Sequence, residues 1–408
     1  MPVNLNIIPG LAVRPSPPRK IRWLGALFFF IAIGWGVIRF SGWASEWTEF
    51  WLFVAGIPSV VWLVLMICRQ GVYLLECIHA SAWDQRREEV ILQETRRGRR
   101  ALQILGVECF TAHSAMINAQ FSASSQELFR GENKLTPQTS WEGHHHIRHS
   151  RLPVTPGQTS EDLLLNCFTE ILKKIAPKFS SLPPGNPVAI LLEYSSTLSG
   201  EKIRDVWRFA WQKRAFQQPV EFVKGKGLGY VDDWLDYRIK DNAVLLVIAL
   251  QIAPEQPEMT TETVVALLLA NRLTQKTLSP LALLHRPEKS GAEDLERGVL
   301  QAGEWVPVRP DTLKHLWLTG LHAEGAQNAI TLPGKAPFVG IDNVSAIHHP
   351  DMTLGHAGCA SPWLAVAAAA QAVQLRDEAH MIISSEQGQD DIWSVVVAPC
   401  VIQQESVT

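Results

Sequence analysis

Two long uncharged runs near the N-terminus constrain this chain more than any other feature of its sequence. The first extends from Trp23 to Ile38, and the second covers the 19 residues from Phe50 to Cys68. Transmembrane helices need about 20 predominantly apolar residues, so both runs are typical of them. Pro58 lies inside the second run, where neighbouring helices can satisfy the carbonyl that a proline leaves free. The sequence therefore predicts a transmembrane helical hairpin over residues 21–69.

Aromatic side chains in and beside these runs suit the interface between lipid and water. The anchor residues that we expect are Trp23, Phe28, Phe29, Phe30, Trp51, Phe53 and Trp62. A cleaved signal peptide is the alternative interpretation of the first run. No small-residue cleavage site follows Ile38, and the segment before the run is long and rich in proline, which favours the hairpin.

The distribution of basic residues predicts how the hairpin is oriented. Several Lys and Arg residues precede the first run and several Arg residues follow the second, whereas the connecting loop carries only Arg39. Loops rich in Lys and Arg stay on the cytoplasmic side. We therefore expect two spans in a bacterial inner membrane, with both termini cytoplasmic and residues 1–20 forming an N-terminal tail.

Residues 70–100 continue with helical periodicity and end in the charged sequence DQRREEVILQETRRGRR. This segment predicts a juxtamembrane basic helix that faces anionic lipid headgroups. A solvated connector helix fits the same residues equally well.

The remainder, residues 101–408, has the composition of a soluble domain. Residues 1–100 contain 12 Lys and Arg against 7 Asp and Glu, whereas the rest contains 25 against 33. An acidic domain argues against nucleic-acid binding, which needs a positively charged surface. The cysteines at positions 68, 77, 109, 167, 359 and 400 form no C-x-x-C pair, so we expect reduced thiols and neither a disulfide framework nor a zinc site.

Strands and helices are expected to alternate through this domain. The predicted strands are 101–110, 187–194, 243–252, 313–319 and 392–398, and the predicted helices are 161–178, 201–214, 261–273 and 364–374. Continuous apolar strands indicate a sheet covered on both faces, and hence a layered α/β domain. Residues 119–160 are polar and weakly periodic, and they predict a long insertion.

The segment DMTLGHAGCASPWLAVAAAAQAV (351–373) resembles the part of β-ketoacyl synthases and thiolases where Gly-His precedes an Ala-rich helix. RRALQILGVECFTAH (99–113) is similar to the opening strand of these enzymes, IKDNAVLLVIALQI (239–252) to the strand that closes their first half, and HMIISSEQGQDDIWSVVVAP (380–399) to their final hairpin. The resemblance covers residues 99–400 and implies a thiolase-like layered α/β domain preceded by the N-terminal transmembrane helical hairpin.

The same resemblance implies a nucleophilic Cys and two His residues. The nucleophile is expected at 223–227, where the chain reads VKGKG. The first His is expected at Thr319-Gly320, with His322 slightly too late, and the family's Lys position holds Asp351. Only the second His remains, as His356, and the glycine-rich turn of the final hairpin is reduced to Gly388. The resemblance therefore implies a pseudoenzyme with no catalytic set and no cofactor.

A histidine cluster in the insertion is the weak candidate for a metal site. It consists of His144, His145, His146 and His149. Clustered His residues can bind a divalent metal, but no carboxylate or thiolate ligand lies at a convincing spacing. A solvated polar loop is the preferred interpretation.

Three further motifs contain residues that can bind a ligand or act as a nucleophile. His348 and His349 precede His356 closely, so the three could converge on a ligand. Cys359 could pair with His356 as a nucleophile, although a packed small-residue turn is the preferred interpretation. The glycine-rich Gly225–Gly229 lacks the pattern of a phosphate-binding loop.

These expectations combine into a membrane-anchored, catalytically inactive thiolase-like adaptor or scaffold with protein partners. By its architecture it resembles accessory proteins of type VI secretion clusters, such as the lipase-adaptor family, in effector loading or at the membrane complex. The alternative is a membrane-bound acyltransferase or thioester-processing enzyme that uses His356 with an unrecognised nucleophile. The soluble domain is expected to form a homodimer or heterodimer, with AVLLVIALQI as a strand at the sheet edge.

Overall fold

The computed structural model describes residues 3, 5–41, 46–117, 120–122, 131–141, 143, 146–214, 216–307, 313–341, 344–385 and 391–400. It divides into two compact units. One comprises Asn4–Arg96, and the other comprises Arg97–Thr408 with Met1–Val3. Each unit is described by itself.

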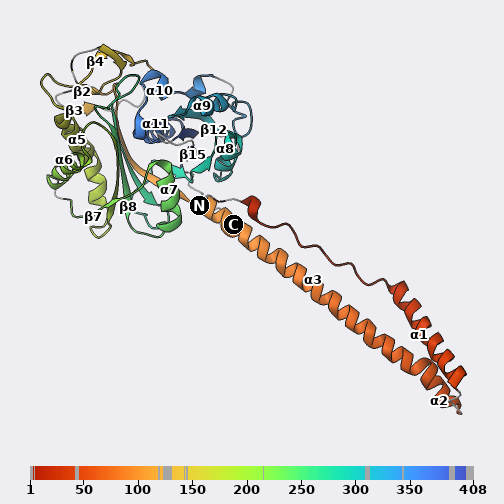
Figure 1. Cartoon of the computed structure of the whole chain (residues 1–408). Helices are drawn as coiled ribbons and strands as arrows, with labels where there is room; N and C mark the ends of the chain where they lie inside the picture. Colours follow the sequence, from red (N-terminus) through yellow and green to blue (C-terminus); the bar gives the residue numbers. More distant parts are fainter. Residues whose placement is uncertain are drawn as a thin grey trace. The chain divides into compact units, whose positions relative to one another are not determined.

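The first unit is built from helices. They are α1 (Lys20–Ser41), the short α2 (Trp47–Trp51), a π-helical turn (Leu52–Gly56) and the long α3 (Ile57–Gly98) (Figure 1). Two of its helical segments, Lys20–Phe40 and Trp47–Gly98, are long and apolar enough to cross a membrane. Pro58 directly follows the π-helical turn, inside the continuous helical segment Trp47–Gly98, and it cannot donate the hydrogen bond that a helical residue gives to the preceding turn. Residues 70–98, which belong to the predicted juxtamembrane segment, form the second half of α3.

One face of α3 is covered by the chain that precedes it. Trp62 Nε1 donates a hydrogen bond of 2.7 Å to the carbonyl of Trp23, at the start of α1. Further along, the backbone N–H of Ala12 donates to Asp84 at 2.9 Å, and Arg87 donates to the carbonyl of Pro9 at 2.7 Å. The N-terminal tail therefore lies along the same helix as α1.

The second unit contains the sheets. Its long strands are β1 (Ala101–Phe110), β6 (Val188–Ser195), β8 (Val244–Gln251), β9 (Thr263–Asn271), β12 (Leu313–Thr319), β14 (Ala379–Ser385) and β15 (Ile392–Ala398), and its short ones are β7 (Val220–Val223), β10 (Ala282–His285), β11 (Glu288–Ser290) and β13 (Ile347–His348). Its helices are α5 (Ser160–Ser181), α6 (Gly200–Gln212), α7 (Gly227–Tyr237), α8 (Leu295–Glu304), α9 (Ala323–Ile330), α10 (Pro350–Thr353) and α11 (Ser361–Arg376).

The strand order shows that the unit contains the same fold twice. The order is β13-β12-β14-β15-β10-β1-β9-β8-β6-β7, with β11 paired to β15. In the first half, β6 is parallel to β7 and β8, and β9 is antiparallel to β8 and β1. In the second half, β12 is parallel to β13 and β14, and β15 is antiparallel to β14 and β10. The two halves meet where β1 pairs with β10.

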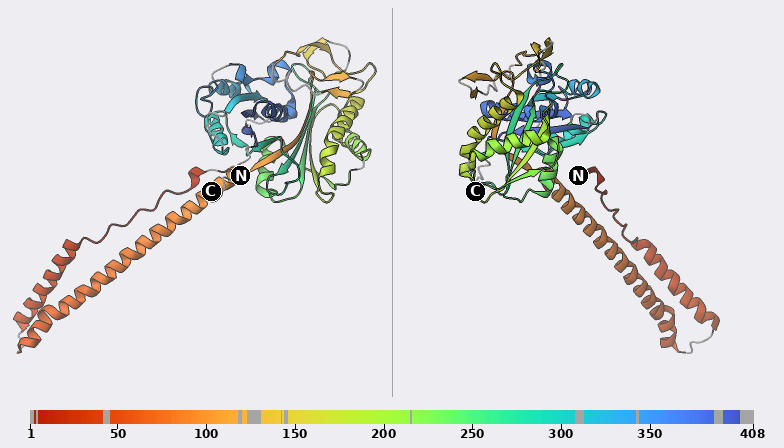
Figure 2. Two further views of the ribbon diagram at one scale, coloured as in Figure 1. Left: turned by 180° about the vertical axis from the view of Figure 1, so that it is seen from behind. Right: turned by 60° about the vertical axis from the view of Figure 1, so that its left-hand side comes forward.

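Three apolar clusters divide the unit into layers (Figures 1 and 2). The largest joins the helices α7 and α11 to the inner faces of both half-sheets. The second packs α5 and α6 on the outer face of the first half, and the third packs α8 and α9 on the outer face of the second half. Two helices therefore lie between two half-sheets, each of which carries helices outside. The predicted layered α/β fold is confirmed.

Most of the expected elements are present. The predicted strands correspond to β1, β6, β8, β12 and β15, and three predicted helices correspond to α5, α6 and α11. The helix predicted over 261–273 is wrong, because this segment is the strand β9, which pairs on both sides. All nine of its residues are buried, so its sequence lacks the polar face that separates an amphipathic helix from a buried strand.

The prediction that AVLLVIALQI lies at a sheet edge is also wrong. This segment is β8, which pairs with β6 on one side and with β9 on the other. Its eight residues are all buried, because helices cover both faces of the half-sheet.

The predicted insertion forms two small hairpins where the structure describes it. One joins β2 (Ala115–Ile117) to β3 (Gln120–Ser122), and the other joins β4 (Thr136–Thr139) to β5 (His146–His149). Just after β5, the buried hydroxyl of Ser150 donates to the carbonyl of Leu354 at 2.6 Å. The insertion is thereby attached to the segment that leads into α11.

Candidate functional site

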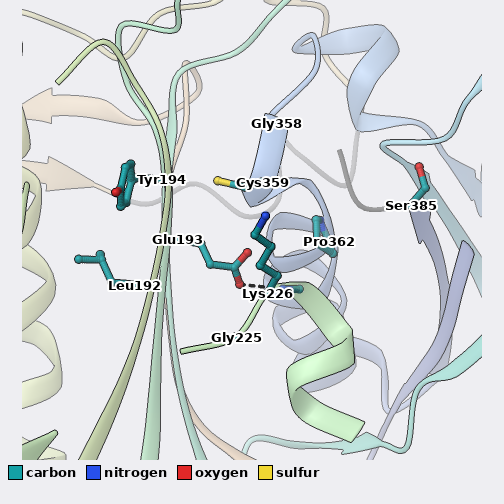
Figure 3. Close-up of a pocket in the computed structure, with 10 residues that line it drawn as sticks. Leu192, Glu193, Tyr194, Gly225, Lys226, Gly358, Cys359, Pro362 and Ser385 are labelled. Carbon is teal, nitrogen blue, oxygen red and sulfur yellow. Dashed lines mark hydrogen bonds between the residues drawn. The ribbon is translucent and has the colours of Figure 1, made fainter. Parts of the chain in front are cut away.

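A cavity of about 400 Å³ lies where the two halves meet at the N-terminal ends of their central helices (Figure 3). Its lining comes from the end of β6, from the residues before α7, from the turn before α11 and from the end of β14; the residues are Leu192, Glu193, Tyr194, Gly225, Lys226, Gly227, Gly358, Cys359, Pro362 and Ser385. In open α/β sheets, ligands bind at the carboxyl ends of the strands. The cavity occupies that position in both halves.

Glu193 is the buried charge of the cavity, and only 9% of it is exposed. Its Oε1 accepts hydrogen bonds from the backbone N–H of Gly227 at 3.0 Å and from Trp363 Nε1 at 2.9 Å. Gly227 is the first residue of α7, and a helix N-terminus carries a partial positive charge. The carboxylate of Glu193 therefore occupies the anion-favouring end of α7 and connects it to α11. Glu193 is not among the site residues predicted from the sequence.

Cys359 and Lys226 extend into the same cavity from opposite sides (Figure 3). The thiol of Cys359 donates to the carbonyl of Leu250 at 3.5 Å. Burial, together with the charge of Glu193, raises the pKa of this thiol to about 12, although backbone hydrogen bonds and Lys226 oppose the shift. Cys359 is therefore a protonated thiol at neutral pH. It lies in the small-residue turn that the sequence predicts, and it also lines a cavity.

The turn before α11 depends on glycine. Gly358 has a φ of +56°, and a Cβ at this position would lie 2.2 Å from Oε1 of Gln251. Gln251 in turn donates to the carbonyls of Thr261 at 2.9 Å and His356 at 2.6 Å. One buried amide therefore fixes both the turn and the loop that carries His356.

His356, the remnant of the catalytic set, lies beside Asp351. Its Nδ1 is 3.4 Å from Asp351 Oδ2, and this hydrogen bond raises the pKa of the imidazole. Asp351 also accepts from Thr319 Oγ1 at 2.9 Å and from the N–H of Gly320 at 2.6 Å. The side chain of His356 is 58% exposed and is not among the residues that line the cavity. Thr319 and Gly320, where the family's first His is expected, thus both donate hydrogen bonds to Asp351.

The positions that the resemblance assigns to catalysis are connected by hydrogen bonds, but only the expected nucleophile position lines the cavity. Lys226 and Gly227 line the cavity, and so does Ser385, whose hydroxyl donates to the carbonyl of Gly320. Gly320 in turn binds Asp351, the partner of His356. The nucleophile position therefore holds a lysine and a glycine, and the first His position holds no imidazole.

The other two histidine candidates differ in their surroundings. Burial lowers the pKa of His349, and the nearby charge of Asp351, the partner of His356, opposes that shift. His348 contacts a different group of side chains. Nε2 of His348 lies 3.2 Å from Nδ1 of His315, whose ring stacks on His380 with centroids 4.6 Å apart. His315 also lies 3.1 Å from Glu378. Burial lowers the pKa of His348 to about 4. This cluster is a neutral, buried group in the second half-sheet.

The insertion histidines are described only in part. His144 and His145 lie outside the described residues. His146 is exposed, whereas His149 is buried with its Nδ1 2.9 Å from the carbonyl of Ile147. Within the part of the chain that the structure describes, no group of three or more His, Cys, Asp or Glu side chains has the geometry to hold a metal ion. Gly388 also lies outside the described residues.

The duplicated layered fold is thiolase-like. The ishigamide ketosynthase/chain length factor has a TM-score of 0.51 and 12% identity over 73% of this chain and 99% of its own. Human mitochondrial 3-ketoacyl-CoA thiolase with CoA has a TM-score of 0.47 and 8% identity over 74% and 99%. Peroxisomal 3-ketoacyl-CoA thiolase of Saccharomyces cerevisiae, described as five layers built from two core domains of identical topology, has a TM-score of 0.44 and 12% identity over 74% and 99%.

No protein-family model and no curated protein matches the sequence. At these identities the likeness establishes the fold alone.

Proposed function

We propose that this chain is a membrane-anchored thiolase-like protein that acts by binding other proteins and not by catalysis. The observation that carries the proposal is the replacement of the nucleophile at the start of α7. Lys226 precedes the helix, and Glu193 accepts the hydrogen bond of its first N–H group. The carboxylate of Glu193 thus occupies the position where the N–H groups at the start of the helix would stabilise a reacting thiolate.

Cys359, the thiol in the cavity, does not replace the missing nucleophile. A thiol attacks as the thiolate, and burial together with Glu193 disfavours that form of Cys359. An activated Cys needs a base within hydrogen-bonding distance. Among the described residues, the hydrogen bond of Cys359 goes to the carbonyl of Leu250, and the contact of His356 goes to Asp351.

The cavity also supports the alternative, a membrane-bound acyltransferase or thioester-processing enzyme. Cys359 would be its nucleophile, since this thiol lines the cavity with Lys226 nearby. His356 would then have to leave Asp351 to serve as the base.

Acyl transfer from a fluorescent acyl thioester to the purified full-length protein separates the two proposals. We expect no label on the wild type. A purified 3-ketoacyl-CoA thiolase treated in parallel is the positive control for the probe, because its catalytic thiol should become labelled. Label on the wild type that disappears in Cys359→Ala would establish the enzyme and refute the binding protein.

The localisation belongs to the proposal as well. We place both termini in the cytoplasm of a bacterial inner membrane, since the basic residues flank the two apolar helices on their outer sides. A periplasm-active reporter fused after Thr408 should stay silent, and one inserted at 42–45, outside the described residues, should be active. The reverse pattern would contradict the topology.

The partner class is the most specific part of the proposal. A hairpin anchor on a thiolase-like domain without a nucleophile suits an adaptor, and we propose an accessory role in type VI secretion, in effector loading or at the membrane complex. Affinity purification from native membranes should retain a secretion component or an effector in stoichiometric amount. Recovery of the protein alone would count against an adaptor.

A further inference from the structure

The N-terminal tail runs as an extended chain beside α3 (Figures 1 and 2) and is bound to it through its backbone. Three side chains on one face of α3 hold residues 9–12. Trp83 Nε1 donates to the carbonyl of Gly10 at 3.3 Å, Arg87 Nε donates to the carbonyl of Pro9 at 2.7 Å, and Asp84 Oδ1 accepts from the N–H of Ala12 at 2.9 Å. Because all three bonds go to main-chain groups, they select an extended backbone and place few demands on the side chains of the tail.

The tail has the burial pattern of a polyproline II helix. Its sequence from Pro9 to Pro18 is rich in proline and forms neither helix nor strand. Ala12, Pro15 and Pro18 are half-buried, whereas the residues between them are exposed. A polyproline II helix has three residues per turn, so every third residue lies on the same edge. The tail therefore presents one edge of such a helix to α3.

The face of α3 beside the tail suits a polyproline II helix. Ala80 is only 6% exposed, and the small side chains of Cys77 and Ala80 allow a close approach. Aromatic rings line the grooves that recognise proline-rich segments, and Tyr73 and Trp83 supply them here. The covered residues beyond the uncharged run recur every three or four positions; they are Arg69, Tyr73, Cys77, Ala80, Asp84 and Arg87.

The tail is stretched between its two attachment points on α3. Trp62 bonds to Trp23 of α1, and Asp84 bonds to Ala12. Trp62 and Asp84 are 22 positions apart, which at about 1.5 Å per residue is roughly 33 Å. On the other side, the eight positions from Ala12 to Lys20 span roughly 25 Å as polyproline II, and the first turn of α1 adds roughly 5 Å. The two paths agree within about 3 Å, so the tail has almost no spare length.

We propose that the face of α3 from Arg69 to Arg87 is a docking groove for a polyproline II segment, that the chain's own residues 9–18 occupy it, and that the tail is a taut strap holding α1 against α3. If α1 swung away from α3, the distance from Trp23 to Asp84 would have to increase, and a tail without spare length resists that. The strap lies within the first unit, so it works in the same way whether or not the chain binds other proteins.

Chemical cross-linking of the full-length protein in detergent tests whether the tail occupies the groove. Helical side chains point toward the N-terminus of their helix, so the carboxylate that binds Ala12 lies toward Ala80. Both cysteines of α3 are first replaced by serine. Ala12→Cys is then combined with Ala80→Cys or, as the matched control, with Ala82→Cys on the exposed side of α3. A short thiol cross-linker should join the first pair within one chain of 45.4 kDa and leave the second pair unjoined.

Changes in the tail and in its contacts test the strap itself. Deleting Ser16 and Pro17 shortens the tail by roughly 6 Å and should abolish the cross-link, whereas inserting two glycines after Ser16 should preserve it. Arg87→Ala should slow cross-linking by roughly fivefold, since it removes one hydrogen bond to the tail. Arg86→Ala is the matched control and should leave the rate unchanged, because Arg86 pairs with Glu89 on the exposed side.

Three results would overturn the strap. Absence of a cross-link at Ala80, or equal cross-linking at Ala82, would show that the tail does not lie in the groove. A cross-link that survives the deletion would show that the tail is slack. A joined product of twice the chain's mass would assign the groove to the tail of a second copy.

Discussion

Replacing Asp236 by alanine is expected to be one of the most destabilising single changes in the second unit. Arg286 is fully buried, and its guanidinium binds both Asp236 and Asp232, the latter at 2.9 Å. Arg97 donates to Asp236 from the last turn of α3 at 2.8 Å. Burial alone would raise the pKa of Asp236, but the hydrogen bonds from Arg97 and Arg286 outweigh it and hold the pKa well below its usual range.

The expected magnitude follows from this arrangement. Removing one partner of a buried ion pair costs about 3–5 kcal/mol. Arg286 keeps its contact with Asp232 at 2.9 Å, so its charge stays partly compensated and we expect the lower end of this range. For a unit of this size, that loss lowers the melting temperature by on the order of 10 °C. Asp205→Ala is the matched control, since Asp205 and Arg208 form an exposed pair at 3.0 Å that is worth less than about 1 kcal/mol.

Thermal unfolding of the full-length protein in detergent, followed by tryptophan fluorescence, measures the difference. Because the folded pKa of Asp236 is lowered, its stabilisation is fully present above the unfolded value of about 4 and is lost as the pH falls through the folded pKa. The full effect should therefore appear at pH 7. Melting temperatures of Asp236→Ala and Asp205→Ala that agree within about 2 °C would refute the ion cluster as a source of stability.

Three further predictions concern single residues. Gly358→Ala should lower the free energy of unfolding by about 1–3 kcal/mol, because the φ of this residue is +56° and the added Cβ would clash with Gln251. Gly291→Ala is the control and should be neutral, since no atom lies near the added Cβ. Equal free energies of unfolding for the two variants would contradict the tight turn. His356→Ala should leave partner binding intact and lower the free energy of unfolding by less than about 1 kcal/mol. Because the folded pKa of His356 is raised, its contribution to stability is present below about pH 6.5 and is lost as the pH rises through the folded pKa. Loss of binding without loss of stability would show that His356 has a functional role. His348→Phe should reduce the loss of stability that occurs as the pH falls below about 6.5. The folded pKa of His348 is lowered to about 4, so the unfolded chain takes up this proton at a higher pH than the folded protein does. An unchanged dependence of stability on pH would exclude His348 as the titrating group.

The sequence was informative wherever local pattern and tertiary role agree. The amphipathic spacing of α5 identifies a helix, and the short apolar run of β6 is recognisable as a strand because it follows the turn sequence PPG. β9 was mistaken for a helix because a segment buried on every side carries no periodicity. The helix α7 was missed as well, since its glycine-rich start reads as a loop, and only the hydrogen bond from Gly227 to Glu193 explains how the helix begins.

The candidate site was predictable as a set of positions and not as a set of contacts. The resemblance located Lys226, Gly320 and His356, which the structure brings into one region around the cavity and Asp351. The signal that could have drawn attention to Glu193 is its place as the single charged residue in the apolar strand VAILLEYS. Its partners lie on α7 and α11, far away in the sequence, so no local pattern could have identified them.

Among the described residues, the sheet ends in β13 on one side and in β7 on the other, and these two edge strands differ. β13 offers only two residues, whereas β7 offers four, with Val220 38% and Phe222 39% exposed. An exposed edge of this kind is a template for another strand, whether of a native neighbour or of an aggregating copy. Of these two edges, β7 is the longer one to which another strand could be added, and a charged residue in place of Phe222 is expected to oppose such pairing.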